Sequence, residues 1–139
     1  MARHVPVAKP VFICDEIVRD STSNKTSILN MFDFIRAPAS SSFPFQLRKL
    51  CVFAEMSDGF GEFMFRVEIA RLDSGDVVIS STERSFDFTD RLKNVVVLFR
   101  MLDCRFPVAG HYLVQLYCEE DVVGDRVLHV IAAGNGVKT

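Results

Sequence analysis

The sequence contains no tryptophan and only two tyrosines, whereas it contains thirteen phenylalanines. We therefore expect phenylalanine to fill most of the core. An excess of charge is lacking as well, since 16 Lys and Arg oppose 18 Asp and Glu for a formal net charge of -2. Because binding to a phosphate backbone needs clustered cations, we expect no nucleic-acid partner.

Long hydrophobic runs are also absent. No apolar run is longer than VVVLF at residues 95–99, which is far below the ~20 residues that span a bilayer. Near the start of the chain, Pro6, Lys9 and Pro10 interrupt the apolar residues that a secretory signal would need. We therefore expect a soluble, cytoplasmic protein that does not associate with a membrane.

The four cysteines lack the close spacing of a metal site. Cys14, Cys51, Cys104 and Cys118 form no CxxC pair, and each lies in or beside an apolar run. In the reducing cytoplasm such residues remain free thiols and behave as small hydrophobic side chains. We expect four reduced and mostly buried cysteines.

The length of 139 residues matches one compact domain that can bury its own core. Hydrophobic residues make up 49% of the chain and charged residues 24%, a balance typical of globular proteins. We expect a single domain over residues 1–139, with an ordered core over about residues 10–132 and loose termini. The small, polar tail at residues 134–139 should fray.

Alternation of apolar and polar residues is the dominant pattern. In EFMFRVEIARL (residues 62–72), Phe63, Phe65 and Val67 would project to one side of a strand, and Arg66 and Glu68 to the other. The same period, or a β-branched apolar run, occurs repeatedly, whereas no helical stripe is sustained. We predict about nine strands, at residues 11–18, 26–35, 49–56, 62–72, 77–80, 85–89, 94–101, 111–117 and 126–132.

Short strands separated by turn residues at this spacing are typical of a β-sandwich. A single antiparallel sheet would leave one face in water, so we expect an antiparallel β-sandwich of about eight or nine strands. We predict loops at residues 20–25, 37–45, 57–61 and 104–110. The expected core residues are Phe32, Phe63, Phe65, Val67, Phe86, Phe99, Tyr112, Val114 and Leu116.

Two adjacent carboxylates, Asp15 and Glu16, follow Cys14 within the apolar stretch VFICDEIVRD. Neighbouring side chains of a strand project to opposite faces, so these acids cannot flank one bond as the acids of a glycosidase do. One of them has to leave the core. We expect the strand to end near residue 15 or to bend at a bulge, with an acid capping loop amides.

The three histidines, His4, His111 and His129, show no metal-binding or catalytic spacing. His111 alternates with core-facing Tyr112 and should point outward, and His4 belongs to the loose N-terminus. His129 lies within an apolar strand, which favours a hydrogen-bonded structural histidine. A Cys–His pair that meets only in space stays open as an alternative.

Acidic residues of the predicted loops favour a different kind of site. Calcium binds several oxygen ligands gathered from loops, although the sequence has no dense D-x-D calcium loop. The acidic residues concerned are Asp15, Asp20, Asp58, Asp73, Asp76, Asp90, Glu119, Glu120 and Asp121.

Three stretches resemble an uncharacterised bacterial all-β domain family of unknown function. They are FICDEIVRDSTSNKTSILNMFDFI, GEFMFRVEIARLDSGDVV and FPVAGHYLVQLYCEEDVVGDRVLHV, so the similarity spans about residues 10–131. At position 30 this chain has asparagine, where we expect glycine in that family. The resemblance implies a small, stand-alone β-sandwich without an established activity. Its last hairpin also resembles those of immunoglobulin-like and C2-like domains, so we expect a sandwich of one of these types.

No group of residues specifies a reaction, so we expect no enzyme, no cofactor, and no catalytic, cofactor-binding or metal-binding residue. We expect a non-enzymatic binding or structural module that engages a protein partner, or another copy of itself, through loops or an edge strand. The alternative is a loop-end site for calcium or a small polar molecule.

Overall fold

The computed structural model describes residues 3–38 and 43–132. These residues form ten strands, and they contain no helix that is long and apolar enough to cross a membrane. The predicted frayed tail at residues 134–139 lies outside the described residues. The strands are β1 (Val7–Arg19), β2 (Thr26–Met31), β3 (Phe34–Ala37), β4 (Phe45–Ser57), β5 (Gly61–Arg71), β6 (Val77–Ser80), β7 (Arg84–Phe88), β8 (Val95–Phe106), β9 (Gly110–Cys118) and β10 (Asp121–Ala132).

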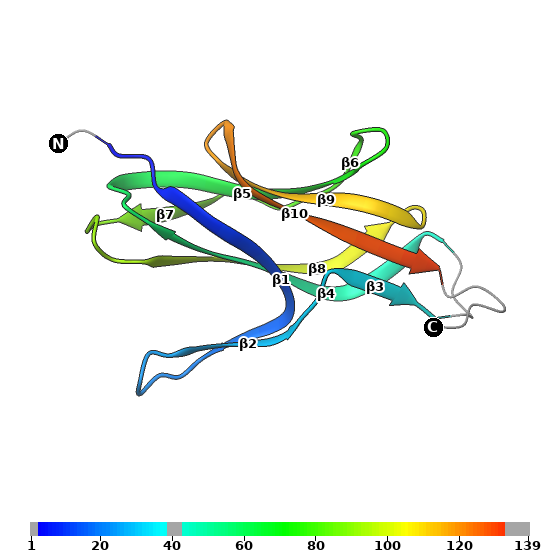
Figure 1. Ribbon diagram of the computed structural model, residues 1–139, viewed down its shortest axis with the longest axis horizontal. Coiled ribbons are helices and arrows are strands. Elements are labelled where there is room, and N and C mark those ends of the chain that lie inside the picture. Colours follow the sequence, from blue (N-terminus) through cyan, green and yellow to red (C-terminus); the bar gives the residue numbers. More distant parts are fainter. Residues whose placement is uncertain (1–2, 39–42, 133–139) are drawn as a thin grey trace.

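The strands form two sheets that lie one above the other (Figure 1). One sheet has the order β2-β1-β4-β8, and the other has the order β3-β10-β9-β5-β6, with β7 also paired to β5. All strand pairs are antiparallel except β3 and β10, which run parallel. The all-β prediction is confirmed, but the predicted number of strands and the purely antiparallel pairing are wrong.

The additional strand arises because the run predicted as one strand at residues 26–35 is two strands. The first, β2, pairs with β1, whereas β3 crosses to the other sheet and pairs with β10. Asn30 precedes the crossing with φ 55°, a conformation that glycine and asparagine adopt most easily. At the crossing, the Arg126 Nε of β10 donates to Asp33 Oδ1 at 2.5 Å. The Arg126 Nη1 also donates to the Val11 carbonyl of β1 at 3.3 Å, which ties the two sheets together.

Several element boundaries differ from the predictions. β4 begins at Phe45, and β8 continues through Cys104 to Phe106, in segments predicted as loop. In the described N-terminal segment, β1 begins at Val7 and His4 forms an isolated bridge with Phe60. The backbone of His4 thus pairs with Phe60 at the start of the described chain, and the looseness of the terminus stays a prediction.

The core lies between the two sheets and is rich in phenylalanine. Seven of the expected core residues are buried, namely Phe63, Phe65, Val67, Phe99, Tyr112, Val114 and Leu116. The other two, Phe32 and Phe86, are partly buried and pack against the same core. The Phe65 ring meets the Phe86 ring edge-on, with centroids 5.4 Å apart and an interplanar angle of 89°, which is a favourable arrangement of aromatic quadrupoles.

Replacing Phe65 by alanine should test this core. Phe65 is 0% exposed, so we expect Phe65→Ala to lower the free energy of unfolding by about 3–5 kcal/mol through lost burial and an unfilled cavity. Phe34→Ala is the matched control, because Phe34 is 52% exposed and should lose less than about 1 kcal/mol. Urea denaturation measures both, and equal losses would contradict the assignment of Phe65 to the core.

Candidate functional site

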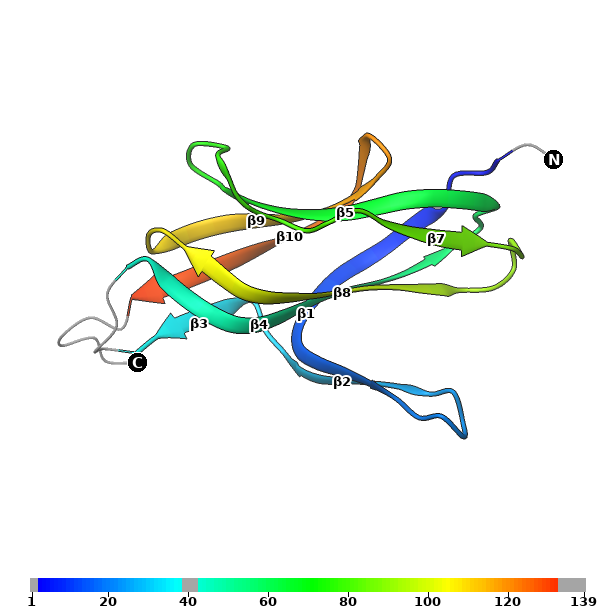
Figure 2. The ribbon, with the colours of Figure 1, turned by 180° about the vertical axis from the view of Figure 1, so that it is seen from behind.

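The strand β1 changes its partner at Cys14. That residue lies opposite both Cys51 of β4 and Met31 of β2. Before Cys14 the strand pairs with β4, and after it the strand pairs with β2. The second half of β1 therefore leaves the sheet together with β2 as a hairpin, and this β1–β2 hairpin projects from the two-sheet body (Figures 1 and 2).

Glu16 anchors the base of the β1–β2 hairpin. Its carboxylate accepts hydrogen bonds from Lys49 Nζ of β4 at 2.6 Å, from Arg100 Nε of β8 at 3.0 Å and from the Ile17 amide at 2.9 Å. Arg100 also donates to the Ile17 carbonyl at 3.0 Å. The Lys49 ammonium, followed by the Ile17 amide and Arg100, lowers the pKa of Glu16 from 4.5 to about 2. Three strands thus meet at one carboxylate.

The prediction that β1 ends near residue 15 is wrong, because the strand continues to Arg19. Its register irregularity lies earlier, between Ala8 and Val11. Asp15 does not cap a loop, since its carboxylate accepts a hydrogen bond from the side-chain amide of Asn30 at 3.0 Å. Asp15 and Glu16 have separate partners on separate elements, so the geometry agrees with the expectation that they do not act as a pair.

A second hydrophobic cluster lies on the outer face of the four-stranded sheet, at the base of the hairpin. Its buried members are Cys14, Ile17, Cys51 and Phe53. The partly buried residues Phe12, Ile28, Val96 and Leu98 pack against them. Most two-layered β proteins expose polar residues on the outer faces of their sheets, so this sheet is unusual in burying apolar side chains on both faces.

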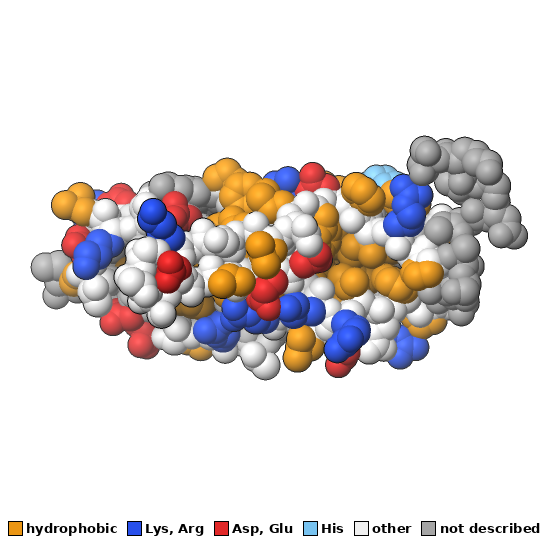
Figure 3. Space-filling model, turned by 90° about the horizontal axis from the view of Figure 1, so that it is seen from below, with side chains coloured by type: hydrophobic (Ala, Val, Ile, Leu, Met, Phe, Trp, Pro, Cys, Tyr) orange, Lys and Arg blue, Asp and Glu red, His pale blue; other side chains and the backbone are white. Residues whose placement is uncertain are grey.

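A groove of about 550 Å³ lies between the β1–β2 hairpin and this outer face. Phe12, Phe53 and Val96 line it from the sheet, and Ile28 lines it from the hairpin. The Phe12 and Phe53 rings stack with centroids 6.3 Å apart. Figure 3 shows the molecule from the hairpin side, where hydrophobic side chains reach the surface among charged ones.

The polar residues of the groove come from several strands and turns. Arg19 and Asn24 belong to the hairpin, Glu55 to β4, and Asn94 precedes β8. The Arg19 Nε donates to Asn24 Oδ1 at 3.3 Å. One cation, one anion and two side-chain amides leave the groove without a strong charge of either sign, and amides can both donate and accept hydrogen bonds.

All four cysteines are free and buried among the described residues, as expected. Cys14 and Cys51 lie opposite each other beneath the hairpin. Burial is the main cause that raises the pKa of Cys14 to about 11, and it also raises the pKa of Cys51. Both residues therefore remain neutral thiols at physiological pH, and neutral thiols are poor nucleophiles.

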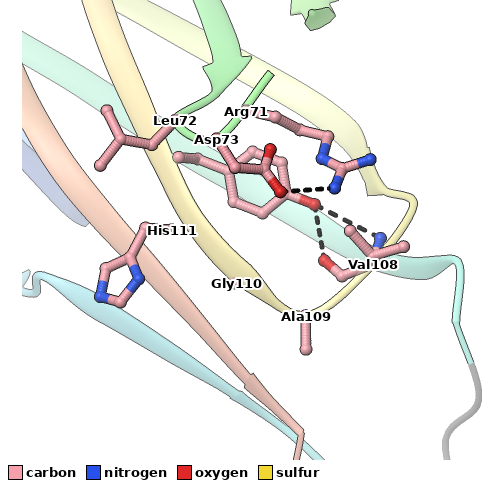
Figure 4. Close-up of a pocket in the computed structure, with 8 residues that line it drawn as sticks. Arg71, Leu72, Asp73, Val108, Ala109, Gly110 and His111 are labelled. Atoms are coloured by element: carbon pink, nitrogen blue, oxygen red, sulfur yellow. Dashed lines mark hydrogen bonds and ion pairs between the residues drawn. The ribbon is translucent and has the colours of Figure 1, made fainter. Parts of the chain in front are cut away.

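A second pocket, of about 320 Å³, lies where the β5–β6 and β8–β9 turns approach each other (Figure 4). The Tyr112 hydroxyl donates to the Val108 carbonyl at 2.6 Å and accepts from the Val108 amide at 3.3 Å. Arg71 pairs with Asp73 at 2.8 Å. Apart from His111, the polar side chains of this pocket bond to one another or to its backbone, which leaves few groups that could bind a ligand.

Six of the nine acidic residues considered for calcium have hydrogen-bonding partners of their own, and Asp15, bonded to Asn30, is one of them. Asp58, Asp73 and Glu119 each contact an arginine at 2.8 Å, and the hydrogen bond from that arginine is the main cause that lowers the pKa of each. Asp20 and Asp90 accept hydrogen bonds from backbone amides of their own turns. Within residues 3–38 and 43–132, no three His, Cys, Asp or Glu side chains gather as a metal site would require.

The histidines lie in two places. His4 contacts Asp58 at 3.4 Å near the N-terminus. His111 is exposed, as expected, and its ring stacks on that of His129. No residue that the structure describes makes a hydrogen bond to the His129 ring, so the hydrogen-bonded His129 stays a prediction.

The residues of the groove were not singled out from the sequence, although one signal for them was present. Residues 50–54 are five consecutive buried positions in β4. A strand that is covered on one face alternates in burial, so a continuous run indicates cover on both faces. The apolar runs LCVFA and VVVLF carry this signal, but they do not say what covers the second face.

The fold and the site together define an all-β domain of two packed sheets with an open apolar groove on one outer face. The chain belongs to the family of unknown function DUF6941, whose model matches residues 9–131. The match covers nearly all of the described strands. No curated protein matches the chain.

Substituting Glu16 by glutamine should change the acid sensitivity of the fold. The pKa of Glu16 is lowered to about 2 in the folded protein, so its stabilising effect is present above pH 4.5 and is lost as the pH falls toward 2. We expect the free energy of unfolding of Glu16→Gln to fall less over this range than that of the wild type, as measured by urea denaturation at successive pH values.

Glu120→Gln is the control, because Glu120 is exposed and makes no ion pair with a described residue. Its acid sensitivity should equal that of the wild type. If Glu16→Gln retained the full wild-type pH dependence, the carboxylate would not anchor the hairpin as described.

Proposed function

We propose that this domain is a non-enzymatic protein-interaction module that binds an extended, apolar segment of a partner protein. The binding surface is the groove between the β1–β2 hairpin and the outer face of the four-stranded sheet. One observation carries the proposal: this outer face presents Phe12, Phe53 and Val96 in an open groove of about 550 Å³. Apolar surface that the fold leaves open in this way favours binding of another apolar surface.

The shape and charge of the groove favour an extended and neutral ligand. Its floor crosses β1, β4 and β8, so a segment lying along it can contact three strands in succession. An extended segment exposes an amide and a carbonyl at each residue, which Asn24 and Asn94 can bind at the rim. The balanced charges of Arg19 and Glu55 favour neither nucleic acid nor an anionic membrane surface.

The chemistry near the groove supports a role without catalysis. Cys14 and Cys51 are neutral and buried, and Glu16 is held by two cations and an amide. A catalytic acid or base needs a pKa near the working pH, and the lowered pKa of Glu16 is far from that range. The loop-end site for calcium or a small polar molecule stays an alternative, but six of its nine candidate acidic residues already accept hydrogen bonds from other groups of the chain.

We also infer a reducing compartment, the cytoplasm, for this protein. The support is the set of four buried free thiols, since an oxidising compartment favours disulfides. The more specific type of architecture, an immunoglobulin-like or C2-like sandwich, and a bacterial origin likewise stay predictions. A partner that is a second copy of the chain would be one form of the proposed interaction.

Selection from a library of random dodecapeptides on the immobilised full chain should identify the ligand class. We expect the selected peptides to be rich in apolar residues and poor in charge. When one such peptide is titrated into isotopically labelled protein, chemical-shift changes should concentrate at Phe12, Ile28, Phe53 and Val96. Calorimetry with Val96→Asp should show at least tenfold weaker binding, about 1.4 kcal/mol, because a carboxylate would be desolvated in the groove.

Val77→Asp is the matched control, because Val77 is a 50% exposed valine of β6 in the other sheet. This variant should bind as the wild type does, and circular dichroism verifies that both variants are folded. Failure of the library to enrich apolar peptides would overturn the proposal. It would also be overturned by shift changes confined to the six-stranded sheet, or by unchanged binding to folded Val96→Asp.

A further inference from the structure

The two histidines of the six-stranded sheet form a stacked pair on its surface. His111 of β9 and His129 of β10 lie directly opposite each other in the antiparallel register. Their ring centroids are 4.0 Å apart, and the ring planes differ by 9°. Neither ring has a hydrogen bond or an ion pair with a described residue, so no described neighbour occupies the nitrogen atoms of either imidazole.

The backbone explains why these rings are so close. The His129 amide donates to the Asp33 carbonyl at 2.9 Å, on the side away from β9. The His111 carbonyl accepts from the Leu72 amide at 3.0 Å, on the side away from β10. The two residues are therefore a non-hydrogen-bonded pair, the arrangement in which opposite Cα atoms are nearest, at about 4.5 Å. Side chains at such positions make the closest cross-strand contacts.

We propose that His111 and His129 together bind one divalent transition-metal ion of the zinc class on the outer face of the β9–β10 hairpin. Two imidazoles on rigid, paired strands provide two nitrogen ligands without a change of backbone conformation. Rotation about the side-chain bonds of each histidine turns one ring nitrogen toward a common ion at about 2.0–2.1 Å. Water completes the coordination, because no third His, Cys, Asp or Glu joins the pair within the described residues.

The ligand set selects the class of ion. Imidazole nitrogen suits zinc, nickel and copper, whereas calcium and magnesium prefer oxygen ligands. The neighbour of β10 on its other side is β3, and Phe34 of β3 lies opposite His129. An apolar side chain and not a carboxylate therefore lies beside the histidine pair. A hard cation therefore finds no oxygen ligands from these positions. This site is on the opposite sheet from the groove and does not depend on the proposed function.

Titration of the full chain with zinc chloride tests the proposal. We expect one zinc ion per chain by calorimetry, with chemical-shift changes at the His111 and His129 rings and no response to magnesium or calcium. His111→Ala and His129→Ala should each weaken binding at least tenfold, about 1.4 kcal/mol. Should His129→Ala fail to fold, His129→Gln retains much of the side-chain volume and should show the same loss.

His4→Ala is the matched control, because His4 is the remaining histidine and contacts Asp58 instead. This variant should bind zinc as the wild type does. Zinc should also raise the melting temperature of the wild type and of His4→Ala, since an ion that binds only the folded state stabilises it. The proposal is overturned if zinc does not bind, if binding survives in His111→Ala, or if His4→Ala loses affinity to the same extent.

Discussion

The Glu16 carboxylate determines where the β1–β2 hairpin lies, and the groove depends on that position. Beyond Cys14, β1 no longer pairs with β4, so backbone hydrogen bonds between these two strands cannot orient the hairpin. Lys49 and Arg100 reach Glu16 from the two neighbouring strands instead. All three side chains are partly exposed, and solvent screens such ion pairs. The two ion pairs therefore mainly orient the hairpin and add little to the stability of the fold. The energy comes chiefly from the apolar cluster beneath, where each large buried side chain contributes about 1.5–3 kcal/mol.

Burial of β4 on both faces distinguishes this domain from a sandwich with two wet outer faces. Leu50, Val52 and Ala54 face the core between the sheets, and Cys51 and Phe53 belong to the outer cluster. The hairpin covers only part of that outer face, and what it leaves open is the groove. The same sheet thus stabilises the fold on one side and presents an open apolar groove on the other. The stacked histidines lie on the other, six-stranded sheet. Their rings are close because His111 and His129 are a non-hydrogen-bonded pair of neighbouring strands.

Much of the fold could be predicted, because it depends on local alternation. The period of two in β5 and β9 identified strands and the core positions of Phe63, Phe65 and Leu116, which the structure buries. The boundary between β2 and β3 could not be predicted in this way. The run TSILNMFDFI is continuously compatible with a strand, and it divides because β3 pairs with β10, which lies far along the chain. Contacts between distant segments leave no periodic signal in either segment.

The acidic residues and the histidines show the same difference between what local sequence specifies and what pairing between distant strands decides. Adjacency of Asp15 and Glu16 in a strand already excludes a shared site, since alternate residues face opposite sides. That Glu16 meets Lys49 and Arg100, and that His111 meets His129, depends on the register between strands, which local sequence does not specify. The sequence by itself thus determined most of the strands, their buried sides and the free thiols, because each follows from local pattern and composition. Only the tertiary structure decided the partner of each strand, the direction of the hairpin and the residues that meet in the groove, because these follow from pairing at long range.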